Sequence, residues 1–293
     1  MYNTFIVAYL YETHLHTTSV SKCAVSLGGD YITPYIDKGY SGMIVTDHFY
    51  NANCALSRKL PWDEWVTRFY RGYEEAKEEG YRKNFDVFFG WEETFDSCDD
   101  YLIYGLDKAW LLEHPEVKTW TRGEQYRAVR EAGGCVVQAH PFRQRFYINR
   151  VILSTGCVDA VEIVNGGHED VSFDALAYRY AQKISVPMTA GSDIHDATGV
   201  DYGEIHGVYS KNKLNSIHDY VNMILNNEIS GIKVDNERYD FPGGSEDSVS
   251  EYHKLPDRLK FFGTENVRVP VEIRDAGDKV TGMDWKNFLN MPV

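Results

Sequence analysis

Cysteine is scarce in this chain of 293 residues, which contains only Cys23, Cys54, Cys98, Cys135 and Cys157. An odd number of cysteines with no C-x-x-C spacing disfavours a disulfide framework and a structural zinc knuckle, and a cytoplasmic location fits best. No apolar run approaches the ~20 residues that cross a membrane, so we expect no membrane span. The apolar N-terminus has no basic segment and no small-residue cleavage site. Residues 1–11 are therefore expected to contain a first strand rather than a signal peptide.

Basic residues are also under-represented, since 30 Lys and Arg stand against 44 Asp and Glu, for a formal net charge of -14. This balance disfavours broad nucleic-acid binding driven by phosphate neutralisation, although a local basic pocket or a bound metal can still attract an anion. Hydrophobic residues make up 43% of the chain and aromatic residues 14%, which is enough for a sizeable core. The length suits one large α/β barrel or two ordinary domains.

Apolar runs typical of strands alternate with helical segments or long connections over the first 227 residues. The expected strands span residues 4–11, 43–46, 86–91, 101–104, 135–139, 158–164 and 186–190, and the expected helices span 31–38, 62–79, 121–132, 172–184 and 216–227. Gly80 is the expected C-cap of the second helix, and Thr121 and Glu124 form a capping box. The alternation predicts a parallel α/β sheet or barrel.

The C-terminal part differs in composition. Residues 240–257 are polar and rich in acids, and they are expected to form a loop. Apolar residues over 267–273 then alternate with polar ones, as in a half-buried strand, and Pro270 indicates a sheet edge. We therefore divide the chain into a barrel, residues 1–231, and an extension packed on it, residues 232–293. The sequence does not show the role of this extension.

Side chains that can bind metals stand where several apolar runs end. His14 and His16 follow the first run, and Asp193 and His195 follow the run over 186–190. Residues i and i+2 of a strand face the same side, so each pair aims two side chains at one point. Parallel α/β barrels carry their sites at these strand ends. Other residues of the same types lie beside the runs in between: His48, Glu92 and His140 follow such runs, and Asp100 directly precedes the run over 101–104.

These imidazoles and carboxylates match the needs of a polynuclear metal site. A metal that activates water requires neutral imidazoles and carboxylates around a fixed centre with an open position. A second metal also requires a bridging carboxylate. A lone histidine is more often a hydrogen-bonding or surface residue, which is the role expected of His114, His168, His206, His218 and His253. The paired motifs and their strand context instead indicate a metal site.

The motifs together resemble those of the PHP (polymerase and histidinol phosphatase) superfamily. They are His14-Leu15-His16, Thr46-Asp47-His48, Gly90-Trp91-Glu92, His140-Pro141 and Gly191-Ser192-Asp193-Ile194-His195, and their order and spacing fit from residue 12 to about 200. The resemblance implies an α/β fold, a distorted (β/α)7 TIM-like barrel with metals at the C-terminal ends of its strands. Known members are mostly phosphoesterases: histidinol phosphatases, nucleotide phosphatases and polymerase-associated nucleases.

The resemblance also implies cofactors and their ligands. The cofactors would be two or three divalent ions, such as manganese, zinc or iron. The ligands of the first ion would be His14, His16, Glu92 and Asp193. Those of the second would be Glu92, acting as a bridge, with His140 and Asp100. Those of the third would be His48 and His195.

Two positions depart from the family pattern. The family often has histidine where this chain has Asp100, and a carboxylate there favours harder ions such as manganese. The family also usually has an Asp or His several residues after its H-x-H motif, where residues 19–23 offer neither. The third site would then be weak, empty, or completed by a water or a residue from elsewhere. Cys23 could replace the missing ligand, although a packed thiol is the commoner role.

Several basic residues could contact a substrate. Arg143, three residues after His140, could bind a phosphate group through two hydrogen bonds, or it could be a surface or ion-paired arginine. Arg145 and Arg150 are nearby alternatives. Lys22 could supply positive charge where a ligand is missing, although a solvated lysine is the commoner case.

Other residues near the motifs are expected to act indirectly. Glu162 and Asn165 lie at a strand end in a pattern that the family also shows, and they would hydrogen-bond to ligand histidines. Glu93 would face away from the metals, because adjacent strand residues point to opposite sides. The tryptophans expected in the core are Trp62, Trp65, Trp91 and Trp110.

We therefore expect a metal-dependent phosphoesterase that hydrolyses a small phosphomonoester or nucleotide-type phosphoester with a metal-activated hydroxide. Arg143 and the metals would neutralise charge that develops on the phosphoryl group, while Asp193 or His195 would help to move protons. One alternative is an amidohydrolase-like hydrolase of C–N or lactone bonds, which also has H-x-H after its first barrel strand. The early Thr46-Asp47-His48 and the closing D-x-H motif favour the PHP phosphoesterase over this alternative. Another alternative is a PHP barrel that has lost catalysis and serves as a binding or regulatory module.

Overall fold

The computed structural model describes residues 8–96, 99–168, 170–202, 205–234, 238 and 266–290. The start of the first expected strand, the expected loop over 240–257, Cys98 and His253 lie outside these ranges. Among the described residues, every helix is too short or too polar to cross a membrane. The cysteines in these ranges are free thiols, namely Cys23, Cys54, Cys135 and Cys157.

A nine-stranded sheet forms the body of the molecule, with the strand order β10-β9-β1-β2-β3-β4-β5-β7-β8. Its strands are β1 (Tyr9–Leu15), β2 (Gly42–Val45), β3 (Asp86–Phe95), β4 (Asp99–Tyr104), β5 (Cys135–Gln138), β7 (Ala160–Asn165), β8 (Met188–Gly191), β9 (Gly207–Ser210) and β10 (Gly231–Lys233). β1, β2 and β3 are parallel, as are β5, β7 and β8. β2, β5, β7 and β8 are buried along their whole length, as expected for parallel strands covered on both faces.

The sheet curves into a nearly closed barrel because the chain after β8 returns to β1. The backbone N–H of Asp193 donates to the carbonyl of His14 over 2.8 Å, and that of His16 donates to the carbonyl of Ile194 over 2.9 Å. Seven strands, β1 to β5 with β7 and β8, make up the barrel, while β9 and β10 extend the sheet beyond β1. The expected distorted TIM-like barrel is thus confirmed.

β4 is antiparallel to both β3 and β5, whereas only parallel strands were expected. β3 extends beyond its predicted end to Phe95, and β4 begins at Asp99. This connection is too short for the crossover that parallel neighbours need. The start of β4 consequently lies at the barrel edge where its parallel neighbours end. Asp100 is therefore placed at that edge, opposite Thr94 of β3.

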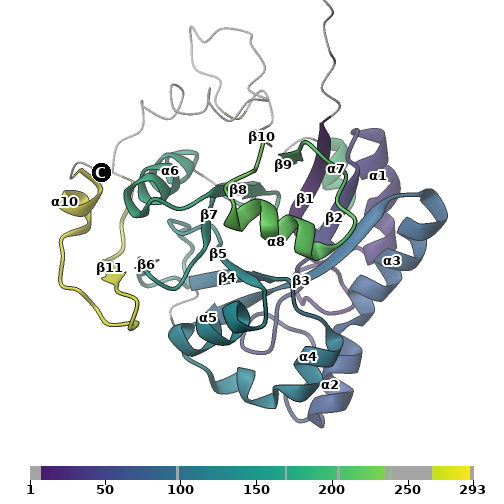
Figure 1. Ribbon diagram of the computed structural model, residues 1–293, viewed down its shortest axis with the longest axis horizontal. Coiled ribbons are helices and arrows are strands. Elements are labelled where there is room, and N and C mark those ends of the chain that lie inside the picture. The colour runs from purple at the N-terminus through teal and green to yellow at the C-terminus, as the bar shows by residue number, and fades with distance from the viewer. Residues whose placement is uncertain are drawn as a thin grey trace, which may run out of the picture.

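Helices lie on the outside of the barrel (Figure 1). They are α1 (Ile32–Asp37), α2 (Trp62–Phe69), α3 (Arg71–Lys83), α4 (Lys108–Glu113), α5 (Arg122–Glu131), α6 (Ser172–Ile184), α7 (Gly199–Tyr202) and α8 (Ile217–Leu225), with 3₁₀ turns η1 (Gly28–Tyr31) and η2 (Pro115–Thr119). α3 packs along β3, α5 on β5 and α6 on β7. The predicted capping box of α5 is confirmed, since Thr121 and Glu124 bond reciprocally.

The single helix predicted over 62–79 is instead two helices, α2 and α3, separated at Tyr70. Gly80 is not a C-cap, because α3 continues to Lys83 and Asn84 takes the left-handed conformation with φ of 55°. A Cβ at Gly80 would lie 2.6 Å from Cγ2 of Val87, so this glycine allows close packing of α3 on β3. The expected core tryptophans belong to one apolar cluster with α2 and β3, namely Trp62, Trp65, Trp91 and Trp110.

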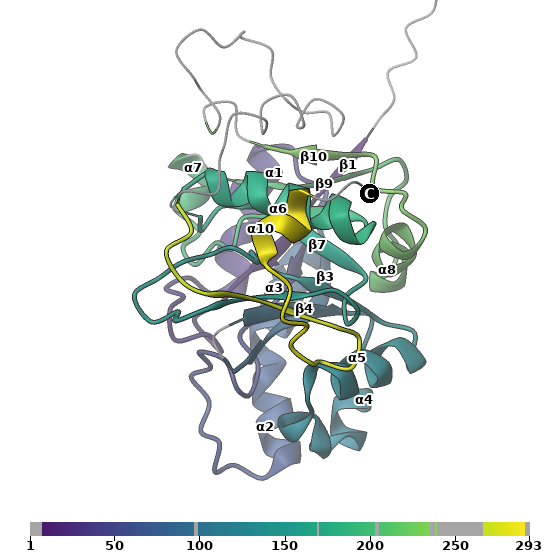
Figure 2. The same cartoon turned by 90° about the vertical axis from the view of Figure 1, so that its left-hand side faces the viewer.

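The C-terminal extension adds a second, two-stranded sheet. β11 (Val271–Arg274) runs parallel to β6 (Val151–Ser154), a strand that the sequence pattern did not predict. α10 (Trp285–Asn290) packs against α6 (Figures 1 and 2). The expected edge strand is present, and the carbonyl of Pro270 accepts from the backbone N–H of Val151 over 2.8 Å. The division at residue 231 stays a prediction, and β10 lies across it.

Candidate metal centre

The barrel edge formed by the ends of β1, β2, β3, β5 and β8 and the start of β4 gathers all the expected ligands in one cluster. They are His14, His16, His48, Glu92, Asp100, His140, Asp193 and His195. Seven of them fall in overlapping groups of three whose potential ligand atoms lie within 4.8 Å of one another. Asp193 joins them through a contact of 3.1 Å between its Oδ1 and Nε2 of His16. The strand-end positions inferred from the sequence therefore converge in space.

The first set of atoms comes from the two paired motifs and Glu92. Nε2 of His14 lies 3.4 Å from Oε1 of Glu92 and 3.4 Å from Oδ1 of Asp193. Nε2 of His16 lies 3.5 Å from Oε2 of Glu92, and the two Nε2 atoms are 3.2 Å apart. Ligand atoms around a tetrahedral ion with bonds of ~2.0–2.2 Å are separated by about 3.4 Å. The spacing of this set therefore matches a single ion between the four side chains.

A second set shares Glu92 with the first. Oε1 of Glu92 lies 3.0 Å from Nε2 of His140, which in turn lies 3.8 Å from Oδ2 of Asp100. Thr94 donates a hydrogen bond to the other oxygen of Asp100. Glu92 is fully buried, and its Oε2 has no hydrogen-bond partner among the described residues. A buried carboxylate placed between two histidine sets is suited to bridge two cations, whose charge would compensate its burial.

A third set consists of the His16, His48 and His195 rings. The ring centroid of His16 lies 4.2 Å from that of His48 and 4.4 Å from that of His195, and both pairs are stacked. Sγ of Cys23 lies 3.2 Å from Nε2 of His48, and Cys23 is exposed. The expectation of a packed thiol is therefore wrong. A loop between His16 and β2, rather than a strand, places this side chain, which is why strand periodicity could not place it.

Two buried carboxylates orient the ligand side chains from behind. Oε1 of Glu162 lies 3.0 Å from Nδ1 of His14, and its Oε2 accepts from the His140 backbone N–H and the Asn165 side chain. These contacts match the indirect role expected of Glu162, whereas the Asn165 side chain contacts Glu162 rather than a histidine of the cluster. Hydrogen bonding at the second ring nitrogen fixes the tautomer, which leaves Nε2 of His14 available to a metal.

Glu12 is the other buried carboxylate, and sequence reasoning missed it. Its Oε1 accepts the backbone N–H groups of His14 and Ser192 over 2.8 and 3.0 Å, and its Oε2 accepts the Tyr35 hydroxyl over 2.7 Å. Glu12 thereby joins the two paired motifs at their backbones. The available signal was a charged residue inside an apolar strand run, two positions before His14.

Two of the clustered residues have unusual backbone conformations. His140 has φ of 28° and Asp193 has φ of 51°, both in the left-handed region that residues with a Cβ rarely adopt. Such conformations cost free energy and persist where the surrounding structure imposes them, often at functional sites. The conformations turn both side chains toward Arg143, whose Nη1 lies 3.1 Å from Nε2 of His140 and whose Nη2 pairs with Oδ2 of Asp193.

Burial and neighbouring charges shift the pKa values within the cluster. Burial lowers the pKa of His14, but nearby carboxylates outweigh it and raise that pKa well above its usual range. Burial also lowers the pKa of His16, and neighbouring histidines lower it further. Burial raises the pKa of Asp193, but Arg143 and His14 together bring it well below its usual range. An ionised carboxylate and a neutral imidazole are the forms that bind metals.

The pKa values of Cys23 and Glu93, which lie near the cluster, are also shifted. Burial raises the pKa of the Cys23 thiol, but hydrogen bonds with His195 and His48 outweigh it and lower the pKa to about 6. Burial raises the pKa of Glu93 to about 8. Glu93 belongs to none of the ligand groups found among the described residues.

A pocket of about 590 Å³ opens onto the cluster. Its lining includes Cys23, His48, Asp100, Arg143, Tyr147, Asp193 and His195. Arg145 also lines it and donates to the carbonyl of Gly167 over 2.6 Å. Arg150 instead pairs with Glu272 of β11 over 2.7 Å. Lys22 is exposed and lies outside the pocket lining, so of the expected basic residues Arg143 and Arg145 are the ones that face the pocket.

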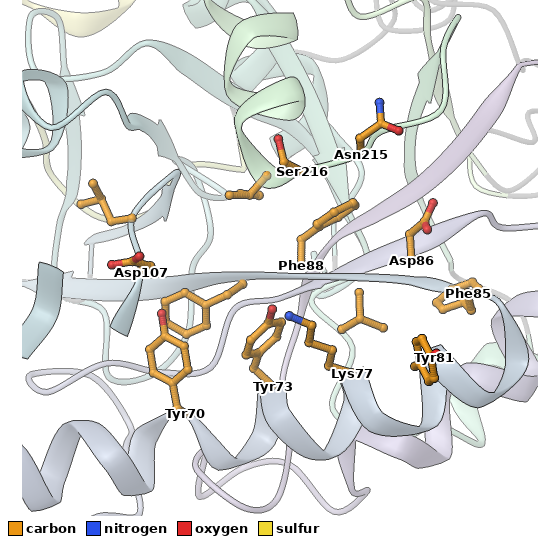
Figure 3. A pocket seen from close by; sticks show the side chains of 14 residues that line it. Tyr70, Tyr73, Lys77, Tyr81, Phe85, Asp86, Phe88, Asp107, Asn215 and Ser216 are labelled. Carbon is orange, nitrogen blue, oxygen red and sulfur yellow. The ribbon is translucent and has the colours of Figure 1, made fainter. Parts of the chain in front are cut away.

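A second pocket, of about 450 Å³, lies away from the cluster, where α3 faces the beginning of β3 (Figure 3). Tyr73, Lys77 and Tyr81 of α3 line one wall together with Tyr70, which precedes α3, and Phe88 projects from β3 toward Ser216, the residue before α8 (Figure 3). The lining contains none of the expected site residues.

The fold of this chain is similar to that of a solved two-domain protein from Bacteroides vulgatus, which contains a predicted PHP-like metal-dependent phosphoesterase. The TM-score is 0.57 at 13% sequence identity, over 78% of this chain and 66% of that one, so this chain spans just under two thirds of that protein's length. PsfC from Pseudomonas syringae gives a TM-score of 0.49 at 15% identity, over 73% of this chain and 88% of that one. An amidohydrolase from Chromobacterium violaceum gives 0.42 at 14% identity, over 64% and 87%.

These similarities concern the fold. At 13% identity, the first match shows that the two proteins share the barrel fold. The TM-scores of the other two are too low to bear on function. No protein-family model and no curated protein sequence matches the chain.

Proposed function

We propose that this protein is a metal-dependent phosphoesterase that acts on a small phosphomonoester or a nucleotide-type phosphoester. The observation that carries the proposal is the first set of atoms, in which His14, His16, Glu92 and Asp193 stand 3.1–3.5 Å apart across the closing strands of the barrel. Two further sets share residues with it. We infer that the cluster holds two or three divalent ions, with manganese, zinc and iron as the candidates.

The donor set fits these ions. Imidazole suits zinc and iron, and carboxylates suit manganese, so a mixture of both accommodates any of the three. The unpartnered Oε2 of buried Glu92 calls for a cation. When bound, such ions lower the pKa of a water molecule and neutralise charge on a phosphoryl group. In this proposal His14, His16, Glu92 and Asp193 hold the first ion.

Arg143 is the proposed phosphate-binding residue. Its guanidinium lies between Asp193 and His140 and lines the pocket, so it can turn donors toward an anion placed beside the metal cluster. An arginine offers a planar pair of donors that matches two phosphoryl oxygens. His195, which is 27% exposed on the pocket wall, can exchange a proton with the leaving group when its Nε2 holds no metal. Lys22 has no role in this proposal, because its side chain lies outside the pocket lining.

The test is release of phosphate from a panel of phosphomonoesters and nucleotides, with and without added manganese or zinc. We expect metal-dependent turnover that His14→Ala abolishes. His218 is exposed on α8, so His218→Ala is the matched control and should behave as the wild type. Absence of turnover across the panel with both metals would falsify the proposal.

Two other outcomes would identify the alternatives. Hydrolysis of amides or lactones, but not phosphoesters, would indicate an amidohydrolase-like enzyme. Fewer than two tightly bound ions per chain, measured by elemental analysis, would favour a barrel without catalysis. A cytoplasmic location stays part of the proposal, supported by the free thiols of the described cysteines.

A further inference from the structure

The loop that follows β1 places Cys23 against two of the clustered histidines. We propose that the Cys23 thiolate is a ligand of a third metal ion, together with Nε2 of His48 and Nε2 of His195. The proposal rests on the proposed function only in assuming that the cluster binds metals. It gives the third site a sulfur ligand at the position where the sequence offers neither a carboxylate nor an imidazole.

The first support is the direction of the two rings. Nε2 of His48 faces Sγ of Cys23 over 3.2 Å, while Nδ1 of the same ring lies 2.7 Å from Oε2 of Glu92. Nδ1 of His195 lies 2.8 Å from the carbonyl oxygen of Asp193, and His195 also hydrogen-bonds to Cys23. A metal-binding histidine usually directs its second ring nitrogen to a carboxylate or a carbonyl in this way. Both Nδ1 atoms therefore face an acceptor oxygen, so Nε2 is the nitrogen that each ring presents to a metal.

The second support is that the backbone holds Cys23 in place. The Val25 N–H donates to the carbonyl of His195 over 2.8 Å, and the His48 N–H donates to the Ser21 hydroxyl over 3.0 Å. Ser21 itself donates to Asp47 over 2.7 Å. The residues on either side of Cys23 are therefore tied to the segments that carry the two histidines. A preorganised ligand loses little conformational entropy on binding a metal.

The third support is independent of the thiol. Glu92 is fully buried, and its Oε2, which faces the His48 ring, has no hydrogen-bond partner among the described residues. An unpaired buried carboxylate oxygen indicates positive charge nearby. An ion bound at Nε2 of His48 brings positive charge to this ring, whose Nδ1 lies 2.7 Å from that oxygen.

A thiolate changes which ion the third site prefers. When Cys23 binds the ion, the metal forms a bond to sulfur and the thiol proton is released to solvent. Soft sulfur favours zinc over manganese, whereas the first two sets present only nitrogen and oxygen. We therefore expect the centre to hold two kinds of metal ion. The position formed by His48, His195 and Cys23 should retain zinc when manganese occupies the other positions.

Cobalt substitution tests the sulfur ligand directly. The full-length protein is loaded with cobalt(II), and its near-ultraviolet absorption is measured, because a thiolate–cobalt bond gives an intense charge-transfer band. We expect the band in the wild type and in Cys157→Ser, whose thiol is buried and faces the carbonyl of Ala276. We expect Cys23→Ser to lose the band together with one bound ion per chain.

A second measurement avoids dependence on a variant. Alkylation of Cys23 by iodoacetamide, followed by peptide mass spectrometry, should be blocked in the zinc-loaded wild type and restored by a chelator. Bound cobalt without the charge-transfer band, or equal alkylation with and without zinc, would overturn the Cys23 assignment while leaving the phosphoesterase proposal intact. A wild type that binds no cobalt or zinc would overturn both.

Discussion

At the scale of single residues, the cluster depends on groups that are not themselves candidate ligands. Glu12 accepts backbone hydrogen bonds from both paired motifs, and Glu162 holds the His14 ring and the His140 backbone. All of these contacts are buried. Loss of these hydrogen bonds would move the closely spaced ligand atoms out of position. Glu12 and Glu162 should therefore affect metal affinity although neither binds a metal in this proposal.

Glu12→Gln tests this dependence. The amide retains one acceptor but presents an N–H₂ group to the Ser192 and Tyr35 hydroxyls that now donate to the carboxylate. We expect a loss of about 1–3 kcal/mol in the free energy of unfolding and roughly a 10–100-fold loss in metal affinity. Urea unfolding and metal titration by calorimetry would measure the two effects. Exposed Glu113→Gln is the control, and equal metal affinity in both variants would contradict the positioning role.

Asp174 provides a pH-dependent prediction away from the ligands. It lies 2.7 Å from Nδ1 of His168 and accepts from Nε of Arg238 over 2.7 Å, all with buried side chains. Burial raises the pKa of Asp174, but Arg238 and His168 outweigh it and hold the pKa below its usual 3.8. A depressed carboxyl pKa gives stability that is present above pH 3.8 and lost as the pH falls through the folded-state value.

Asp174→Asn should therefore lower the free energy of unfolding by roughly 3–5 kcal/mol, because it leaves a buried arginine without a countercharge from this residue. The difference from the wild type should stay constant from about pH 7 to about pH 5, since the titration lies below that range. Urea unfolding at several pH values would show this. A difference that shrinks across that interval would mean that the Asp174 pKa is not depressed.

Strand periodicity in the sequence was sufficient to locate some of the clustered residues but not others. H-x-H and D-x-H follow from strand periodicity alone, because residues two apart share a face. His14, His16, Asp193 and His195 were located in this way, and the other four expected ligands were located because they lie at or near the ends of neighbouring apolar runs. The orientation of Cys23 and the contacts of Glu12 depend on loop geometry and on strands distant in sequence, which no local pattern encodes. Lys22 was a candidate because it lies in the stretch where a ligand is missing, but in that stretch Cys23 is the residue whose side chain contacts His48.

At the scale of elements, the reversed β4 explains why a carboxylate at the beginning of a strand joins ligands at the ends of others. The short connection between β3 and β4 forces the reversal, and Asp100 then lies beside Thr94 at the correct edge. From the sequence, Asp99 and Asp100 looked like the last residues of a loop before a parallel strand. The direction of a strand depends on its partners, so strand existence was predictable while direction was not.

α3 packs against the Thr17–Asp47 pair, which directly precedes His48. Gly72 faces the Thr17–Asp47 pair, and a Cβ there would lie 2.1 Å from Oγ1 of Thr17 and 2.5 Å from Oδ2 of Asp47. Thr17 donates to both carboxylate oxygens of Asp47, over 2.6 and 2.7 Å, immediately before His48. The close approach of helix and loop therefore requires glycine.

Gly72→Ala should destabilise the protein by about 1–3 kcal/mol, because overpacking outweighs the gain of about 1 kcal/mol in helix propensity. Exposed Glu78→Ala in the same helix is the control and should change stability by less than about 0.5 kcal/mol. Thermal unfolding followed by circular dichroism would compare them. If Gly72→Ala is the more stable variant, α3 does not press on the Thr17–Asp47 pair.

At the scale of the whole molecule, the C-terminal extension is attached to the barrel through both packing and charge. β11 pairs with β6, and buried Arg122 at the start of α5 links β4 to the turn after β11. Arg122 donates to Asp99 over 2.5 and 2.9 Å and to Asp278 over 3.0 Å. The sequence predicted an edge strand near residue 270, but short β6 was missed, because its partner lies more than a hundred residues away.

Arg122→Met should cost roughly 3–5 kcal/mol of unfolding free energy, since buried Asp99 would lose its countercharge. Metal content should stay unchanged, because Arg122 forms its ion pairs with Asp96, Asp99 and Asp278, none of which is an expected metal ligand. Exposed Arg127→Met is the control. Urea unfolding with parallel elemental analysis would separate the two effects, and a loss of metal in folded Arg122→Met would contradict the assignment of this residue to structure alone.

We propose that the barrel edge from β1 to β8 builds one polynuclear metal centre. The most direct measurement is a crystal structure of the protein grown with manganese, with data collected at the manganese absorption edge. We expect at least two anomalous peaks, one enclosed by His14, His16, Glu92 and Asp193 and one between Glu92, Asp100 and His140. An ordered cluster in these positions with no anomalous peak would contradict it.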